Sequence, residues 1–338
     1  MNVSIICPVF NTNPDQLRTA TASVLAQVGQ HAIEVILVDD CSTSAATLEA
    51  LRAIAAADAR VQAVFQNRNA GPAAARTAGI ARAAHSWIGF IDSDDLWPVD
   101  KLEHAAVVQA MWPDTRWISG NYTTLVPDGT LHDSIHLSTA LESRDPTQAA
   151  HRIQAPLLTR ILIGGWLPLG ASLFRKDLLA QAGGFDVRLM YGEDWLLCMR
   201  LSTLAPMDYS ETRAYVLRRQ GSSMMRSFDR MSAKFAHSGR MARRDPLLGS
   251  VRRELRWFYY ATLKDIAMNN ALNGRKLRGL FYALRALLVD PREVSDMLLF
   301  MRNLPARGTV LAQGLRPYST AEQVILAHIS DAAPPQAR

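Results

Sequence analysis

The sequence predicts an α/β protein in which a mostly parallel sheet is flanked by helices and followed by a helical C-terminal region. Short apolar runs alternate with helical stretches over residues 1–100, which is typical of strands joined by crossover helices. Such crossovers are right-handed and place the joined strands parallel to one another. Toward the C-terminus, leucines and methionines instead recur at helical spacing. A length of 338 residues allows one large domain or two ordinary ones.

Four apolar runs predict the strands of this sheet. The second run is uninterrupted and ends in two aspartates, as expected for a strand that is buried on both faces. In chain order the four runs are Val3–Cys7, Val35–Val38, Val61–Phe65 and Trp87–Ile91.

Residues that favour helix starts stand between these runs. Asn13 is a good N-cap residue, and the proline after it, Pro14, fits the first helical position. Ser44 can cap the second helix, and Pro72 opens the third. A helix is therefore predicted between each strand and the next.

Distinctive residues follow three of the predicted strands at their carboxyl ends. They are Pro8-Val9-Phe10-Asn11, Asp39-Asp40 and Asp92-Ser93-Asp94-Asp95. Because parallel strands end at the same edge of a sheet, these residues are expected to line one crevice, where α/β proteins bind their ligands.

Asp92, Asp94 and Asp95 crowd three negative charges into four residues. A divalent cation with oxygen ligands relieves such repulsion, and Mg²⁺ or Mn²⁺ commonly bridges carboxylates to phosphates. The other interpretation is a loop that caps the helix expected near residues 98–108. The position at a strand end, opposite the two aspartates of the second strand, favours the metal site.

Two further segments have a functional and a structural interpretation each. Residues 69–76 form a small-residue loop that runs into a helix, where backbone N–H groups and Arg76 could bind phosphate. A tight strand-to-helix turn would look similar.

Asp194 stands beside Trp195, and partial burial there would raise the pKa of a carboxylate as suits a general base. Taken alone, this segment favours an ordinary helix start with acidic residues near the dipole.

Together these segments resemble the family-2 glycosyltransferases of the GT-A fold. The resemblance covers roughly residues 1–220 in family order, through SIICPVFN, VILVDDCS, NRNAGPAAARTAGI, WIGFIDSDDLW and GASLFRKDLLAQAGGFDVRLMYGEDWLLCMRL. It implies an inverting transferase that uses a nucleotide-diphosphate sugar, with UDP-sugar favoured, and Mn²⁺ or Mg²⁺ as cofactor. The acceptor would be a glycan or a lipid-linked molecule in bacterial cell-surface polysaccharide or glycolipid synthesis.

The resemblance also implies roles for residues on the nucleotide side. Pro8 and Phe10 would border the base, with Phe10 standing where the family often has tyrosine. Asp40 would hydrogen-bond the base, and Asp39 is the less favoured candidate for this contact. Arg76 would lie on the nucleotide side as well.

For the chemistry, the resemblance implies that Asp92 lies near the ribose and that Asp94 binds the metal. Asp194 would be the base that deprotonates the acceptor hydroxyl. Glu193 and Trp195 are expected to contact the acceptor or the diphosphate.

The chain departs from the family after the base. Many relatives carry a histidine there, but this chain reads Arg219-Gln220 in a segment without histidine. Arg219 or Gln220 is expected to contact the diphosphate instead. Trp166 lies in a glycine-containing stretch that the family places near the acceptor, and is a further candidate contact.

We expect a catalytic domain over residues 1–220, a basic helical region over 221–330 and a disordered tail over 331–338. From residue 212 on there are 22 Lys and Arg against 9 Asp and Glu, whereas residues 1–211 hold 15 against 22. Leu277, Leu280, Phe281, Leu284, Leu287 and Leu288 form an apolar stripe among these basic residues, and Val294, Met297, Leu298, Met301 and Leu304 form a second. The stripes either pack inside the protein or contact a membrane surface peripherally.

Several other classes are disfavoured. The three separated cysteines do not predict disulfides, and no signal peptide or membrane-spanning stretch is recognisable, so a cytoplasmic enzyme is expected, with peripheral contact at the inner membrane face. A sugar-nucleotide nucleotidyltransferase would start with a glycine-rich segment, but VFNTNPDQL stands there. A non-catalytic nucleotide-sugar-binding subunit would not need the four aspartates of the proposed site. Nucleic-acid binding is not expected, because aromatic stacking residues are not interleaved with the basic ones.

Overall fold

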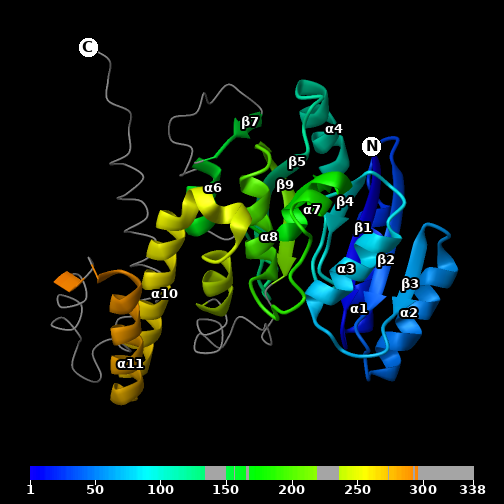
Figure 1. Cartoon of the computed structure of the whole chain (residues 1–338). Coiled ribbons are helices and arrows are strands. Elements are labelled where there is room, and N and C mark those ends of the chain that lie inside the picture. The colour runs from blue at the N-terminus through cyan, green and yellow to red at the C-terminus, as the bar shows by residue number, and fades with distance from the viewer. Residues whose placement is uncertain are drawn as a thin grey trace, which may run out of the picture. The chain divides into compact units, whose positions relative to one another are not determined.

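The computed structural model describes residues 1–133, 150–155, 157–164, 167–218, 236–272, 274–291 and 294–295 (Figure 1). The chain divides into two compact units. The first comprises residues 1–162 and 166–223, and the second comprises residues 163–165 and those from 224 on.

The described part of the first unit is built on one nine-stranded sheet, whose strands follow the order β3-β2-β1-β4-β8-β5-β9-β7, with β6 paired to β5. The strands are β1 (Asn2–Val9), β2 (Ala32–Asp39), β3 (Val61–Phe65), β4 (Trp87–Phe90), β5 (Trp117–Leu125), β6 (Leu131–Asp133), β7 (Ala150–Ile153), β8 (Ser172–Arg175) and β9 (Met207–Arg218). β1, β2, β3 and β4 are mutually parallel where they pair, and β8 is antiparallel to both β4 and β5. The predicted α/β class is therefore confirmed, with a mixed second half of the sheet.

Helices connect and flank these strands. They are α1 (Pro14–Leu25), α2 (Ala45–Ala57), α3 (Pro72–Arg82), α4 (Lys101–Met111), α6 (Leu157–Gly164), α7 (Lys176–Gln181) and α8 (Glu193–Ser202), with a short 3₁₀ turn η1 (Leu169–Ala171). The predicted caps are present. The side chain of Asn13 accepts hydrogen bonds from the backbone of Asp15 and Gln16, and Ser44 accepts one from Thr47.

The strands β1, β2 and β4 are buried on both faces, whereas β3, at the edge of the sheet, is partly exposed. On one face, side chains of β1 and β2 pack with those of α1, α2 and α4 in a single apolar core. On the other face α3 lies against β1, because a Cβ atom at Gly79 would come within 2.4 Å of the Ile6 side chain. Alternation along β1 places Ile5 and Ile6 on these opposite faces, which explains why the strand sequences are almost wholly apolar.

The second unit contains the turn η3 (Pro246–Val251) and the helices α10 (Arg252–Leu272) and α11 (Lys276–Val289). Its core joins aromatic and aliphatic residues of α10 to small residues of α11, namely Tyr259, Tyr260, Leu263, Ile266, Ala267, Ala283 and Ala286. No helix in the described ranges combines the length and the apolar character that crossing a bilayer requires. The second predicted stripe, apart from Val294, and the tail over 331–338 lie outside the described residues.

Candidate active site

Three strand ends meet at one edge of the sheet, as the sequence predicts for parallel strands. Val9 pairs with Asp39 in the register of β1 and β2, and the Asp40 N–H donates to the Val9 carbonyl at 2.8 Å. The segment after β1 also contacts the segment after β4, because the hydroxyls of Thr12 and Ser93 lie 2.6 Å apart. The edge is therefore held together by hydrogen bonds between its loops.

The residues after β1 project an aromatic ring from this edge. Phe10 is half exposed directly after the buried strand β1. Asn11 follows it with φ 49°, and its side-chain oxygen accepts from the backbone N–H groups of Thr43 and Ser44. Pro8 is partly buried within β1, opposite Val38. The exposed Phe10 ring is thus supported by a rigid turn.

Asp39 and Asp40 are both buried and both accept backbone hydrogen bonds. The carboxylate of Asp39 accepts from the Ser42 N–H at 3.2 Å. The two oxygens of Asp40 accept from Ala70 and Gly71, each at 2.8 Å. Asp40 therefore holds the loop that opens α3, in which Gly71 needs its glycine because its φ is 85°. Each carboxylate oxygen has a second lone pair that can accept from a ligand.

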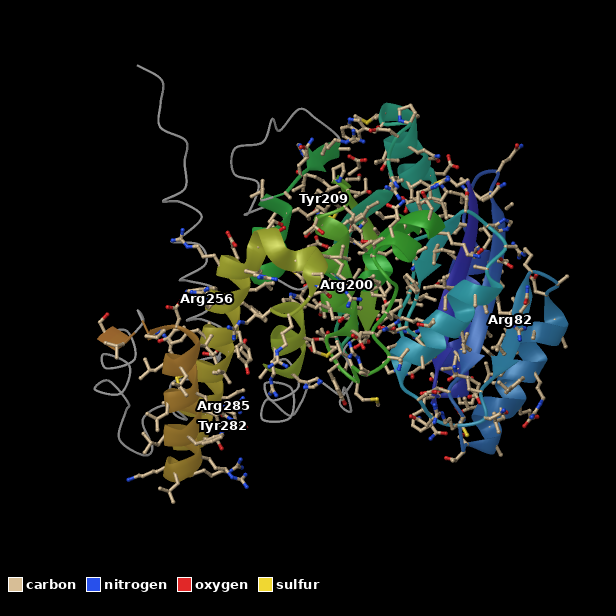
Figure 2. All side chains as sticks on the ribbon, in the orientation of Figure 1. Arg82, Arg200, Tyr209, Arg256, Tyr282 and Arg285 are labelled. Carbon is tan, nitrogen blue, oxygen red and sulfur yellow. The ribbon has the colours of Figure 1, made fainter. Side chains whose placement is uncertain are left out.

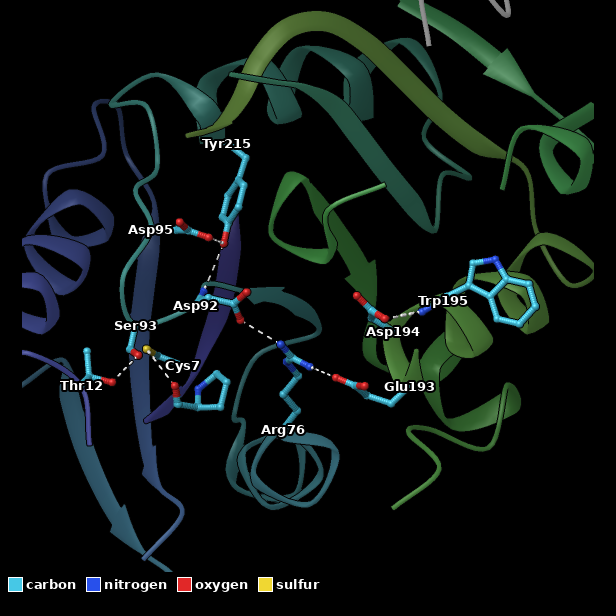
Figure 3. A network of polar contacts seen from close by, with 11 residues as sticks. Cys7, Thr12, Arg76, Asp92, Ser93, Asp95, Glu193, Asp194, Trp195 and Tyr215 are labelled. Carbon is cyan, nitrogen blue, oxygen red and sulfur yellow. Dashed lines mark hydrogen bonds and ion pairs between the residues drawn. The ribbon is translucent and has the colours of Figure 1, made fainter. Parts of the chain in front are cut away.

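Arg76 on α3 is a buried cation that joins two distant carboxylates (Figure 3). Its Nη1 donates to Glu193 Oε1 and its Nη2 donates to Asp92 Oδ1, each at 2.8 Å. Burial works against the charge on Arg76, but Asp92, Glu193 and Asp194 outweigh it and raise the pKa of the guanidinium. The arginine stays charged and connects the end of β4 to the start of α8.

Glu193 is the first residue of α8 and is almost fully buried. Burial, followed by the negative charge of Asp194, raises the pKa of Glu193 to about 7, although Arg76 acts in the opposite direction. A carboxyl group with this pKa exchanges its proton near neutral pH. The Glu193 side chain is nevertheless directed at Arg76 and away from bulk solvent.

Asp194 follows Glu193 and is more exposed. Its Oδ1 accepts from the Trp195 N–H at 2.7 Å, within the first turn of α8. Trp195 itself is buried, and its indole Nε1 donates to the Leu162 carbonyl at 2.9 Å. The tryptophan therefore anchors α8, while the aspartate beside it keeps access to solvent.

The acidic cluster after β4 divides into an inner and an outer part. The inner residue, Asp95, accepts from the Tyr215 hydroxyl and from the Arg218 N–H, each at 2.7 Å, which ties the cluster to β9. Burial, with Asp92 and Asp94 nearby, raises the pKa of Asp95 well above its ordinary value. Asp92 and Asp94 form the outer part and are only partly buried.

The outer carboxylates fit a divalent cation. The pKa of Asp94 is raised, first by burial and then by the charge of Asp92. A bound cation would relieve both effects, and carboxylate oxygens are the ligands that Mg²⁺ and Mn²⁺ prefer. Within the described ranges, no three His, Cys, Asp or Glu side chains gather as a metal-binding group. An ion at Asp94 would accordingly take most of its ligands from outside the chain.

The structure brings together five of the residues that the sequence singled out. Arg76, Asp92, Glu193 and Asp194 lie within one network, and Asp94 is beside it. Trp166, Arg219 and Gln220 lie outside the described residues. Sequence reasoning missed Tyr215, because nothing local marks a tyrosine that bonds to an aspartate 120 residues away.

The amino-acid sequence is similar to a glycosyltransferase family and to proteins of polysaccharide biosynthesis. Residues 4–107 match the family model described as glycosyl transferase family 2. Over 144 residues the chain is 35% identical to the putative teichuronic acid biosynthesis glycosyltransferase TuaG of Bacillus subtilis, covering 42% of this chain and 56% of that protein. A longer match, 29% identical over 302 residues, covers 86% of this chain and 82% of the succinoglycan biosynthesis protein ExoO of Rhizobium meliloti. The match to TuaG thus spans about half of that relative.

Solved structures resemble the fold over nearly the whole chain. The S. aureus TarS 1-349 complex with UDP-GlcNAc has a TM-score of 0.62 at 18% identity, covering 97% of this chain and 92% of that one. The mannosyltransferase PcManGT from Pyrobaculum calidifontis, in complex with GDP-Man and Mn²⁺, has a TM-score of 0.57 at 16% identity, covering 97% and 86%. At these identities the similarity concerns the fold alone.

Proposed function

Because the chain belongs to the family-2 glycosyltransferases and has the GT-A fold, we propose that it transfers a sugar from a nucleotide-diphosphate sugar to a hydroxyl group. The acceptor is a glycan or a lipid-linked molecule in the synthesis of a cell-surface polysaccharide. The names of TuaG and ExoO support this pathway class, and the TarS complexes support a UDP-sugar as the favoured donor. The free cysteines support a cytoplasmic site of action.

The observation that carries the proposal is the bridge formed by Arg76. It joins Asp92, on the side where the donor is expected, to Glu193, the neighbour of the expected base. Transfer requires donor and acceptor to be held at a defined separation, because misplacement of the reacting groups slows a reaction sharply. A buried arginine with two charged partners provides a rigid connection between these two sides.

On the donor side, the exposed ring of Phe10 offers a stacking surface to the base. A carboxylate oxygen of Asp40 accepts a hydrogen bond from the base, with Asp39 as the less favoured candidate for this contact. A carboxylate oxygen of Asp92 accepts one from the ribose. Asp94 would hold Mn²⁺ or Mg²⁺, which supplies charge neutralisation for the departing diphosphate.

On the acceptor side, Asp194 takes the proton of the attacking hydroxyl. We choose it over Glu193 because Glu193 is buried and bonded to Arg76, whereas Asp194 remains partly exposed. A base must come within hydrogen-bond reach of the proton that it removes. One carboxylate on the face opposite the leaving group suffices for a single displacement, which inverts the anomeric centre.

A thermal-shift screen of nucleotide sugars, with and without Mn²⁺, tests this proposal. A ligand that binds only the native state raises its stability, so the true donor should raise Tm, and more so with the metal. Transfer of the sugar to an acceptor is then followed with that donor. No stabilisation by any nucleotide sugar, together with no transfer or donor hydrolysis, would overturn the proposal.

A further inference from the structure

The helix α11 has two apolar faces that differ in the size of their residues. The inner face consists of Gly279, Ala283 and Ala286, which are buried against α10. A Cβ atom at Gly279 would lie 2.9 Å from the Ala267 carbonyl oxygen, so the two helices touch at their backbones there. The closest approach of α11 to α10 thus occurs at small residues, and the partly buried Tyr282, Leu287 and Val289 pack against the same core.

The large apolar residues of α11 lie on the outer face. Their exposed fractions range from 47% to 86%, and they are Leu277, Leu280, Phe281, Leu284 and Leu288. Residues at these spacings share one side of a helix, with 3.6 residues per turn. A helix packed on one side normally carries polar residues on the other. Five large apolar side chains on the outer face of α11 therefore need a partner.

Basic residues border this outer face on both sides. At 100° per residue, Lys276 falls on one flank and Arg278 with Arg285 on the other, and Arg285 Nη2 also donates to the Tyr259 hydroxyl of α10 at 3.5 Å. Between residues 276 and 289 there is no Asp or Glu. The guanidinium of Arg285 lies 5.5 Å from the ring centre of Phe281 and 5.9 Å from that of Tyr282, and Figure 2 shows Arg285 close to Tyr282. The outer face thus combines an apolar centre with cationic edges.

We propose that the outer face of α11 docks on an anionic lipid bilayer. Leucine and phenylalanine side chains enter the acyl boundary of a membrane, while lysine and arginine pair with lipid headgroups. Anionic lipid matches the apolar centre and the cationic edges at the same time.

Two other occupants match this face less well. A second copy would bring its own basic residues against these, which is unfavourable between like charges. The chain segment 296–338 carries four Arg against three Asp and Glu, so it has no excess of negative charge to offer.

Flotation of the full-length protein with vesicles tests the proposal directly. We expect binding to vesicles that contain phosphatidylglycerol, little binding to phosphatidylcholine alone, and release by about 0.5 M salt, where charges are screened within a few ångströms. The double variant Lys276→Gln/Arg278→Gln should lower the partition coefficient roughly 10- to 30-fold. Leu284→Gln/Leu288→Gln should lower it at least as much.

Arg253→Gln/Arg256→Gln is the matched control, since it removes the same charge from exposed positions on α10 and should bind like the parent protein. The thermal unfolding midpoint of each variant checks that the fold is retained. We expect it to be retained because the substituted residues are exposed. The salt and lipid series on the unaltered protein needs no variant at all.

Equal binding to neutral and anionic vesicles, or none to either, overturns the proposal. Self-association that Leu284→Gln/Leu288→Gln abolishes, without lipid binding, would assign the face to a second copy instead. None of these measurements depends on sugar transfer.

Discussion

Arg76 and Glu193 form a buried ion pair with 2.8 Å between Nη1 and Oε1, although 117 residues separate them in the sequence. The second nitrogen of Arg76 binds Asp92, so one side chain connects α3, the end of β4 and the start of α8. Breaking a buried pair by removing one partner is costly because the other charge stays buried and unpaired. Arg76 therefore links the donor side and the acceptor side of the proposed site through direct contacts.

Arg76→Ala should lower the free energy of unfolding by about 3–5 kcal/mol, because one substitution removes the charged donor that both Glu193 and Asp92 bond to. Urea unfolding followed by circular dichroism measures this change. Arg82→Ala is the matched control, since Arg82 is exposed on the same helix. The control should change stability by no more than about 0.5 kcal/mol. Equal effects of the two substitutions would show that the ion pair contributes nothing specific.

Glu193→Gln should change how stability depends on pH. The pKa of Glu193 is raised from 4.5 to about 7 in the folded protein, so the folded state binds this proton more tightly than the unfolded state does. Its contribution is complete below pH 4.5 and is lost as the pH rises through about 7. The difference in unfolding free energy between parent and variant should therefore fall across this window. A difference that is constant from pH 4.5 to 7 would contradict the raised pKa.

Asp94→Asn should abolish nearly all transfer and remove the additional Tm increase that Mn²⁺ gives with the donor. In the absence of metal and donor, the same variant should be as stable as the parent or more stable, because burial and Asp92 disfavour the charged carboxylate. Thermal unfolding with and without EDTA measures both effects. Full activity of the variant, or of the parent in EDTA, would remove Asp94 from metal binding.

Asp194→Asn should leave the affinity for the nucleoside diphosphate unchanged while turnover falls about 10²–10⁴-fold, as expected for loss of a general base. Titration calorimetry with the diphosphate, beside a turnover assay, separates binding from chemistry. Glu193→Gln is the companion variant, since it alters the neighbouring carboxyl but keeps an acceptor for Arg76. If turnover survives in Asp194→Asn and collapses in Glu193→Gln, the base is Glu193.

Much of the first half of the fold could be predicted because its determinants are local. Apolar runs marked the four parallel strands, and Asn13, Ser44 and Pro72 marked the helix starts that the structure contains. Parallel strands end at one edge, so the meeting of the three strand-end segments also followed from the sequence. The antiparallel insertion of β8 between β4 and β5 could not be predicted, because strand order depends on long-range pairing rather than on local pattern.

The sequence by itself determined which residue types gather at the carboxyl edge of the sheet, since strand direction and burial follow from apolar periodicity. The tertiary structure alone decided their partners. It placed Arg76 between Asp92 and Glu193, tied Asp95 to Tyr215, and left four of the leucines of α11 exposed. Periodicity reports that a helix face is apolar but not what covers it. The partner of a charged residue is likewise not visible in the sequence. A charge needs a specific partner only when folding buries it away from water, and the tertiary structure decides which residue that is.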